Sequence, residues 1–321
     1  MSVNYQSENE RPKMKTFIWT EAIGCAEILG PMIKSFTKHH EHRLHIYIYD
    51  EDLKEIEPLI SKNVIAITIP KTKKEVELTK MFLTEPELRQ AYKSGHNGTA
   101  KLWSHIIKSR DEQILIHLDS DTIFVREVIS KLESKLTSGF GVVGSRRPYR
   151  KNISLNGFLN KVRHYLRPDA VNTHCFGFRR DLIAKFNTQD LELLILGKFS
   201  NRFKRIFCPI IDFFDELTFL LRKKGGIFYV DSSRQSRSGK HDRLGEFENS
   251  MISFSAVGSG CVLFKNPNHA TSDTYRDFAL SSYSLFCNLL LEKKFEIPQL
   301  DLPFLNEKIS RLNLDTWQIQ N

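Results

Sequence analysis

The segment from Ile114 to Leu118 is a largely apolar run that ends abruptly in two carboxylates, Asp119 and Asp121, with Ser120 between them. A short apolar run of this kind is typical of a strand buried in the middle of a sheet. Such a strand carries the residues that follow it to the carboxyl edge of the sheet, where open α/β sheets bind their ligands. The segment therefore predicts an α/β fold with an acidic site at that edge.

The spacing of the two carboxylates predicts a cation site. Side chains at positions i and i+2 of an extended segment point the same way, so Asp119 and Asp121 can approach one ion. Hard divalent cations prefer oxygen ligands, and Mg²⁺ or Mn²⁺ held in this way can bind a diphosphate. A turn at the end of the strand is the alternative interpretation, because Asp-Ser-Asp is common in turns.

Strand-like and helix-like patterns alternate along the first half of the chain. Strands are expected at 15–20, 44–49, 64–69 and 114–118, and helices at 22–39, 51–61 and 99–109. Later we expect strands at 140–144, 172–179 and 226–230 and helices at 198–207, 212–224 and 273–291. The alternation predicts right-handed β-α-β units on a mixed, mostly parallel sheet flanked by helices, a Rossmann-like architecture.

The length of 321 residues favours one large domain. We expect residues 1–13 to be a flexible lead-in and residues 14–321 to form a single domain. No apolar run approaches the ~20 residues that span a bilayer, and the polar amino terminus lacks a secretory signal, so a soluble, cytoplasmic chain is expected. The five scattered cysteines predict reduced thiols, with neither a disulfide framework nor a structural zinc site.

Positive charge is concentrated in one part of the chain. Between residues 145 and 243 there are 21 Lys/Arg against 9 Asp/Glu, a net charge of +12, whereas the remainder has 26 against 29. Such asymmetry indicates a polyanionic partner, with a solvated basic face as the alternative. A polar, basic stretch at 232–243 is interpreted either as a lid over a ligand or as a solvated loop.

A second group of titratable residues is the histidine tract, formed by His39, His40, His42 and His45. The tract spans a predicted helix end and the start of the next strand, where polar and cationic groups are expected. Its spacing matches no known arrangement of metal ligands, so we favour a structural role over metal binding.

Several of these features occur in one order. A first strand ends in Thr20 and Glu21, a helix carries Lys101 and Trp103, and the Asp-x-Asp strand follows. A Phe-Gly-Phe strand entering a helix, an Asp-Phe-Phe-Asp-Glu helix and a late Asn-x-Asn-His come after it. From about residue 15 to residue 291 the chain resembles nucleotide-sugar-dependent glycosyltransferases of the GT-A fold with a DxD motif. The resemblance implies a nucleotide-sugar-binding half at 14–144 and an acceptor-binding half with carboxyl-terminal helices at 145–321.

The resemblance also implies a metal centre with Mn²⁺ or Mg²⁺ bridging the donor diphosphate. Asp121 would be a direct ligand, and Asp119 would contact the ribose or the metal. His269 is the candidate for the imidazole that completes the coordination, and carboxylates with one imidazole suit Mn²⁺. A loop histidine with a local partner is the alternative for His269.

Further residues are expected to bind the nucleotide-sugar, which we take to be a UDP-sugar. The resemblance assigns this role to Thr20, Glu21, Ala22, His96, Lys101, Asp119 and Ser120. Trp103 lies on the same predicted helix as Lys101, but an aromatic residue on an amphipathic helix is usually part of the core.

An inverting enzyme of this class needs a carboxylate base to accept the proton of the acceptor hydroxyl. Asp212, Asp215 and Glu216 are the candidates, because the spacing i, i+3 and i+4 places them on one helical face. As an alternative, an acidic helix start simply complements the macrodipole. No motif identifies the base, so retention and inversion of configuration both stay open.

The basic excess suggests the acceptor. The candidate acceptor-binding residues are Arg146, Arg147, Arg150, Lys151, Arg202, Lys204 and Arg205. Cations interleaved with aromatic residues suit nucleic acid, and transfer onto a DNA base requires a flipped base. We favour hydroxymethylated cytosine in phage DNA, modified in the host cytoplasm. The alternatives are a cytosolic transferase for a surface glycan or lipid-linked acceptor, a nucleotidyltransferase, and a non-enzymatic nucleic-acid-binding protein.

Overall fold

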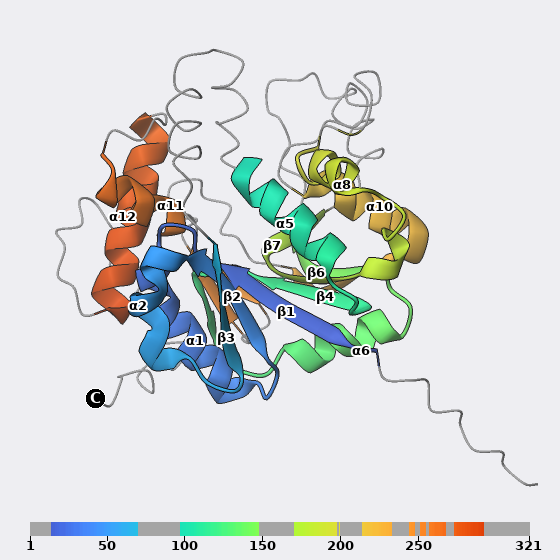
Figure 1. Cartoon of the computed structure of the whole chain (residues 1–321), viewed down its shortest axis with the longest axis horizontal. Coiled ribbons are helices and arrows are strands. Elements are labelled where there is room, and N and C mark those ends of the chain that lie inside the picture. The colour runs from blue at the N-terminus through green and yellow to red at the C-terminus, as the bar shows by residue number, and fades with distance from the viewer. Residues whose placement is uncertain are drawn as a thin grey trace, which may run out of the picture.

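The computed structural model describes residues 14–69, 97–147, 170–197, 199, 214–232, 244–247, 251–254, 257–267 and 273–291. Within these residues the fold is a seven-stranded sheet with helices on both faces (Figure 1). The strands of this sheet are β1 (Thr16–Glu21), β2 (Leu44–Tyr49), β3 (Val64–Ile69), β4 (Ile114–Leu118), β6 (Val142–Arg147), β7 (Ala170–Arg179) and β8 (Ile227–Ser232). The expected α/β class with a mixed, mostly parallel sheet is confirmed.

The strand order is β3-β2-β1-β4-β7-β6-β8. β1 pairs in parallel with β2 and β4, β2 with β3, and β6 with β8. β7 is antiparallel to both of its neighbours, β4 and β6. All five side chains of β4 are buried, in agreement with the interpretation of its apolar run as a central strand.

A second, three-stranded antiparallel sheet has the order β5-β10-β9. It consists of β5 (Thr122–Phe124), β9 (Leu244–Phe247) and β10 (Met251–Phe254). Because β5 begins directly after Asp121, the Asp-x-Asp segment is the passage of the chain from the large sheet into the small one. The sequence did not predict this small sheet.

The helices are η1 (Ala26–Ile28), α1 (Leu29–His39), η2 (Asp50–Asp52), α2 (Leu53–Ile56), η3 (Glu57–Leu59), α5 (Asn97–Ser109), α6 (Ile129–Thr137), η4 (Arg180–Leu182), α8 (Thr188–Ile195), α10 (Asp215–Gly225), α11 (Val257–Lys265) and α12 (Asp273–Leu290). The helix expected at 22–39 starts only at Leu29, as α1. Gly24 has φ +74°, which a right-handed helix does not accommodate. The expected acidic helix at 51–61 is divided into η2, α2 and η3, with Pro58 in the first turn of η3.

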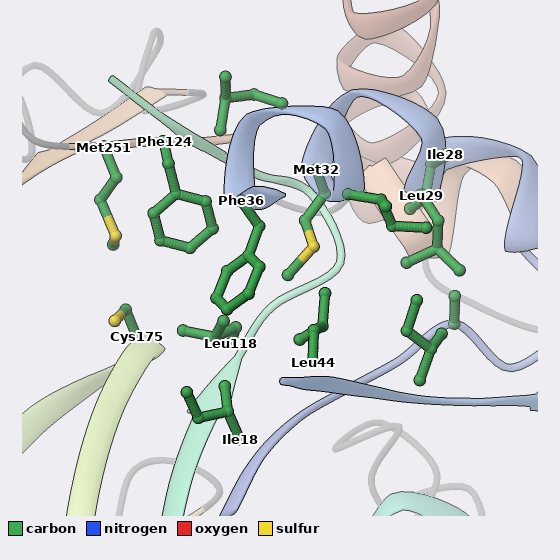
Figure 2. Packing of buried hydrophobic residues seen from close by; sticks show 14 of the residues in the cluster. Ile18, Ile28, Leu29, Met32, Phe36, Leu44, Leu118, Phe124, Cys175 and Met251 are labelled. Atoms are coloured by element: carbon green, nitrogen blue, oxygen red, sulfur yellow. The ribbon is translucent and has the colours of Figure 1, made fainter. Parts of the chain in front are cut away.

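Two apolar cores lie on opposite faces of the large sheet. On one face the core combines alternate residues of the central strands with side chains from α1, α6, α11 and α12. Figure 2 shows Met32 and Phe36 of α1 directed toward Leu44 and Leu118 of the sheet. The other core, under α5, α8 and α10, is aromatic and includes Trp103, which is buried as expected.

Candidate metal centre

The sheet topology creates a switch point between β1 and β4. From β1 the chain continues to β2 and β3 on one side, and it returns to place β4 on the other side of β1. Ligands of open α/β sheets bind at the carboxyl ends of strands that meet at such a point. Glu21 ends β1, and Asp119 follows the last residue of β4, so both belong to this edge.

Asp119, Ser120 and Asp121 form a turn rather than an extension of the strand. The Thr122 backbone N–H donates to the Asp119 carbonyl at 3.2 Å, and β4 has already ended at Leu118. The prediction that an extended backbone aligns the two carboxylates is therefore wrong. The chain turns here because Thr122 begins β5, which pairs with β10 in the other sheet.

The antiparallel partner of β4 contributes a histidine to the same place. Leu118 is paired with Cys175, and the Asp119 backbone N–H donates to the His174 carbonyl at 2.9 Å. The His174 ring nitrogen Nδ1 lies 2.8 Å from Asp119 Oδ2. One ligand atom each from Asp119, Asp121 and His174 lies within 4.8 Å of the other two. Turn and strand pairing thus assemble a group of two carboxylates and one imidazole.

Asp121 is a buried carboxylate that is only partly hydrogen-bonded. Its residue surface is 8% exposed, and its Oδ1 atom has no hydrogen-bond partner among the described residues. Burial, reinforced by the charge of Asp119, raises the pKa of Asp121 to about 7, against the opposing effects of His174 and a hydrogen bond from the Val257 backbone. A cation would compensate the buried charge and bind the unpartnered oxygen.

The dimensions of the group fit a small divalent cation. Ligand atoms bound to one ion at about 2.1 Å are at most about 4.2 Å apart, so the group needs to contract by less than ~1 Å. The side chains of His174 and Asp119 are 16% and 29% exposed, which leaves one side of the centre accessible to a further ligand. The residues present therefore fit a Mn²⁺- or Mg²⁺-type ion.

A polar network of Glu21, Trp103 and His117 lies next to Asp119. The Trp103 indole N–H donates to Glu21 Oε1 at 2.8 Å, and His117 Nε2 lies 3.0 Å from Glu21 Oε2. The other ring nitrogen of His117 is 3.2 Å from the Thr173 carbonyl and 3.8 Å from Asp119 Oδ1. Burial acts to lower the pKa of His117, but the Glu21 carboxylate, Asp119 and the Thr173 carbonyl together raise it. The network thus holds His117 within ion-pair distance of Asp119.

The residues expected to bind the nucleotide-sugar occupy different environments. Thr20 and Ala22 are buried, and the Thr20 hydroxyl oxygen has no hydrogen-bond partner among the described residues. Both carboxylate oxygens of Glu21 are engaged by Trp103 and His117, as described above. Lys101 is exposed on α5, and Ser120 is half-buried in the turn. His96 lies outside the described residues, and nucleotide binding by this set stays a prediction.

Two of the three candidate base residues are described. Asp215 and Glu216 are buried in the first turn of α10, and Glu216 Oε2 accepts a hydrogen bond from the Phe199 backbone N–H at 3.0 Å. Phe214, just before the helix, has φ 70°, a left-handed conformation that is rare for a bulky residue. Its ring packs on the aromatic core. Asp212 lies outside the described residues.

The candidate acceptor-binding residues and His269 lie mostly outside the described residues. Arg146 and Arg147 are in β6, where only their backbone is described. The others lie outside the described residues: Arg150, Lys151, Arg202, Lys204, Arg205 and His269.

The sequence interpretation missed His174 as a candidate ligand. Its segment was predicted to be a return strand, but without the strand's partner or direction. Antiparallel pairing of 175–179 with the 114–118 run is what brings the preceding residue, His174, to Asp119.

Comparison with known proteins does not assign the chain to a class: no protein-family model matches it, and no curated protein matches it. Among the described residues, no helix has the length and apolar character required to cross a membrane.

Proposed function

We propose that the chain is a metal-dependent glycosyltransferase that transfers a sugar from a nucleoside-diphosphate sugar, in particular a UDP-sugar, to a hydroxyl acceptor. The observation that carries the proposal is the group of Asp119, Asp121 and His174 at the switch point of the sheet. Acidic ligands at this position are suited to a cation that faces a phosphorylated ligand.

The architecture supports the same proposal. The seven-stranded mixed sheet with helices on both faces is compatible with the GT-A fold that the sequence resembles. The motif order on which the resemblance rests also agrees with the described elements, because the Asp-x-Asp segment follows β4, a central strand next to β1.

The chain's own residues would act in three ways. Asp119, Asp121 and His174 would hold the cation, which when bound supplies positive charge to the departing nucleoside diphosphate. The network of Glu21, Trp103 and His117 would keep Asp119 in place. Asp215 and Glu216 are proposed as candidates for the base, together with Asp212.

For the acceptor we propose hydroxymethylated cytosine in DNA. The support is the net charge of +12 between residues 145 and 243, which suits a polyanion. A surface-glycan or lipid-linked acceptor and a binding protein without activity are the outcomes against which this part of the proposal is tested.

The test is an assay of nucleoside-diphosphate release by the purified protein with Mn²⁺ and a panel of nucleotide-sugars. It is run with and without duplex DNA containing hydroxymethylcytosine. We expect turnover that disappears in Asp121→Asn and persists in Asp111→Asn, a matched change at an exposed position. A gain in DNA mass equal to one sugar would support the DNA acceptor, and donor turnover without such a gain would contradict it. If no donor is turned over and DNA binding is salt-sensitive, the proposed enzymatic function is refuted and a DNA-binding protein without activity is favoured.

A further inference from the structure

The candidate metal centre combines ligand types that distinguish between divalent cations. Two of its side chains offer carboxylate oxygens and the third offers an imidazole nitrogen. Mg²⁺ and Ca²⁺ are hard ions that take oxygen ligands, whereas imidazole suits transition metals. The donor set is therefore a basis for selectivity and not only for affinity.

We infer that His174 is the imidazole ligand of this centre and that it makes the centre selective for Mn²⁺-type transition-metal ions over Mg²⁺ and Ca²⁺. The inference rests on the metal-dependent function proposed above. It replaces His269, the sequence-based candidate, with a histidine from the strand next to the Asp-x-Asp turn.

The position of His174 is determined by the sheet. Backbone pairing of β7 with β4 continues to the edge, where the His174 carbonyl accepts from the Asp119 N–H at 2.9 Å and from the Thr122 hydroxyl at 3.4 Å. The carbonyl of His174 thus binds both ends of the turn that carries Asp119. Its side chain is 16% exposed, so the ring is held against the centre and not in solvent.

Such positioning before the ion arrives favours direct ligation. A ligand held by rigid strands loses little conformational freedom on binding, which favours a fixed donor set. Replacement of the imidazole by an amide would leave two carboxylates and an oxygen, a set that Mg²⁺ accepts as readily as Mn²⁺. Selectivity should therefore depend on this one ring.

The first test measures Mn²⁺ binding to the nucleotide-free full-length protein. Electron paramagnetic resonance monitors the bound Mn²⁺, and Mg²⁺ is added as a competitor. We expect Mn²⁺ to bind at least about 10-fold more tightly than Mg²⁺. Electron spin-echo modulation of the bound Mn²⁺ should contain a ¹⁴N coupling from imidazole. Absence of that coupling in the wild-type protein, or equal affinity for both ions, would overturn the inference without any need for a variant.

Variants then identify the histidine. His174→Gln should abolish the ¹⁴N coupling, weaken Mn²⁺ binding by about 10-fold or more and bring the Mn²⁺/Mg²⁺ ratio toward one. His269→Gln and His105→Gln, the latter at an exposed position on α5, should retain wild-type coupling and affinity. Loss of coupling in His269→Gln with retention in His174→Gln would overturn the assignment.

The two proposals fail separately. A ¹⁴N-coupled Mn²⁺ site in a protein that turns over no nucleotide-sugar would support the ligand assignment and refute the glycosyltransferase. Conversely, Mn²⁺-dependent sugar transfer by a protein whose bound ion has only oxygen ligands would support the glycosyltransferase proposal and refute the role of His174.

Discussion

Two regions of the molecule gather histidine and carboxylate side chains, and they differ in how those side chains are satisfied. At the candidate metal centre, Asp121 has a buried oxygen without a hydrogen-bond partner among the described residues. In the histidine tract, His40 has both ring nitrogens engaged: Nδ1 lies 3.1 Å from the Phe36 carbonyl, and the Val128 N–H donates to Nε2 at 3.1 Å.

His42 and His45 each have one ring nitrogen next to a protein partner. His42 Nε2 lies 3.1 Å from Glu133 Oε2, and His45 Nδ1 lies 3.1 Å from the Ile18 carbonyl. These contacts connect the segment after α1 to α6 and β2 to β1, so the tract stabilises the fold. The comparison teaches that residue type alone does not mark a metal site. A buried ligand atom without a partner, next to further ligand atoms, is the more specific feature.

The largest effect on Mn²⁺ affinity is expected for Asp121→Asn. Loss of the buried carboxylate should weaken Mn²⁺ binding by about 100-fold or more, beyond the 10–100-fold typical of residues that only orient a ligand. The metal-free variant should nevertheless be as stable as the wild type, or more stable by up to about 2 kcal/mol at pH 8, because burial disfavours the charged carboxylate.

Calorimetric metal titration and urea unfolding check both parts of this prediction. Asp111→Asn serves as the control. A strongly destabilised Asp121→Asn variant would show that the carboxylate is structural, and the contrast with the histidine tract would then disappear.

The opposite result is expected for His40→Ala. The ring stacks on Phe36 with centroids 4.7 Å apart and meets Phe124 edge-on at 4.9 Å, besides its two hydrogen bonds. Its removal should lower the free energy of unfolding by about 2–4 kcal/mol, with Mn²⁺ affinity unchanged. Urea unfolding and the same metal titration measure both quantities. A substantial loss of Mn²⁺ affinity in the folded variant would place the tract in the metal site.

The tract should also make stability depend on pH. Burial lowers the pKa of His40 to about 4, although the hydrogen bond to Phe36 and the charge of Glu127 oppose this shift. Because the unfolded state takes up the proton near pH 6.5 and the folded state only near pH 4, stability falls as the pH is lowered through this window. The His40 contribution should fall by about 2 kcal/mol between pH 7.5 and pH 5.

Urea unfolding at the two pH values, for the wild type and for His40→Gln, isolates this contribution. The pH dependence should be smaller in the variant by that amount. Identical pH dependence in both proteins would contradict the assignment to His40.

The smallest effect is expected for His42→Ala. The side chains of His42 and Glu133 are 25% and 23% exposed, and partly solvated pairs contribute little. The free energy of unfolding should fall by less than ~1 kcal/mol at pH 7, measured in the same urea series. A loss comparable to that of His40→Ala would show that the whole tract, and not His40 alone, acts as a structural centre.

Much of the fold was predictable because its signals are local. β2 and β3 occupy the expected residues, and β4 follows the apolar run from Ile114 to Leu118. The alternation of strands and helices was enough to predict a mostly parallel sheet. The small sheet was not predicted, because β5, β9 and β10 are short and because β5 pairs with β10, a strand more than 100 residues away.

The candidate site was predictable only in part. Asp119 and Asp121 were found because a buried strand followed by two carboxylates is a contiguous pattern. The geometry of the two carboxylates was not predictable from the sequence, because the turn depends on the entry of Thr122 into another sheet. Asp119 and Asp121 lie more than 50 residues from His174, and no local pattern encodes which strand pairs with which.

The sequence by itself determined the class of fold and the two acidic residues at the carboxyl edge, because hydrophobic periodicity and chain order are written along the chain. Only the tertiary structure brought His174 to Asp119 and Asp121 and placed His117 between Glu21 and Asp119. It also decided that Asp121 keeps a buried oxygen without a partner among the described residues. Strand register and burial bring distant residues together, and both are properties of the packed sheet.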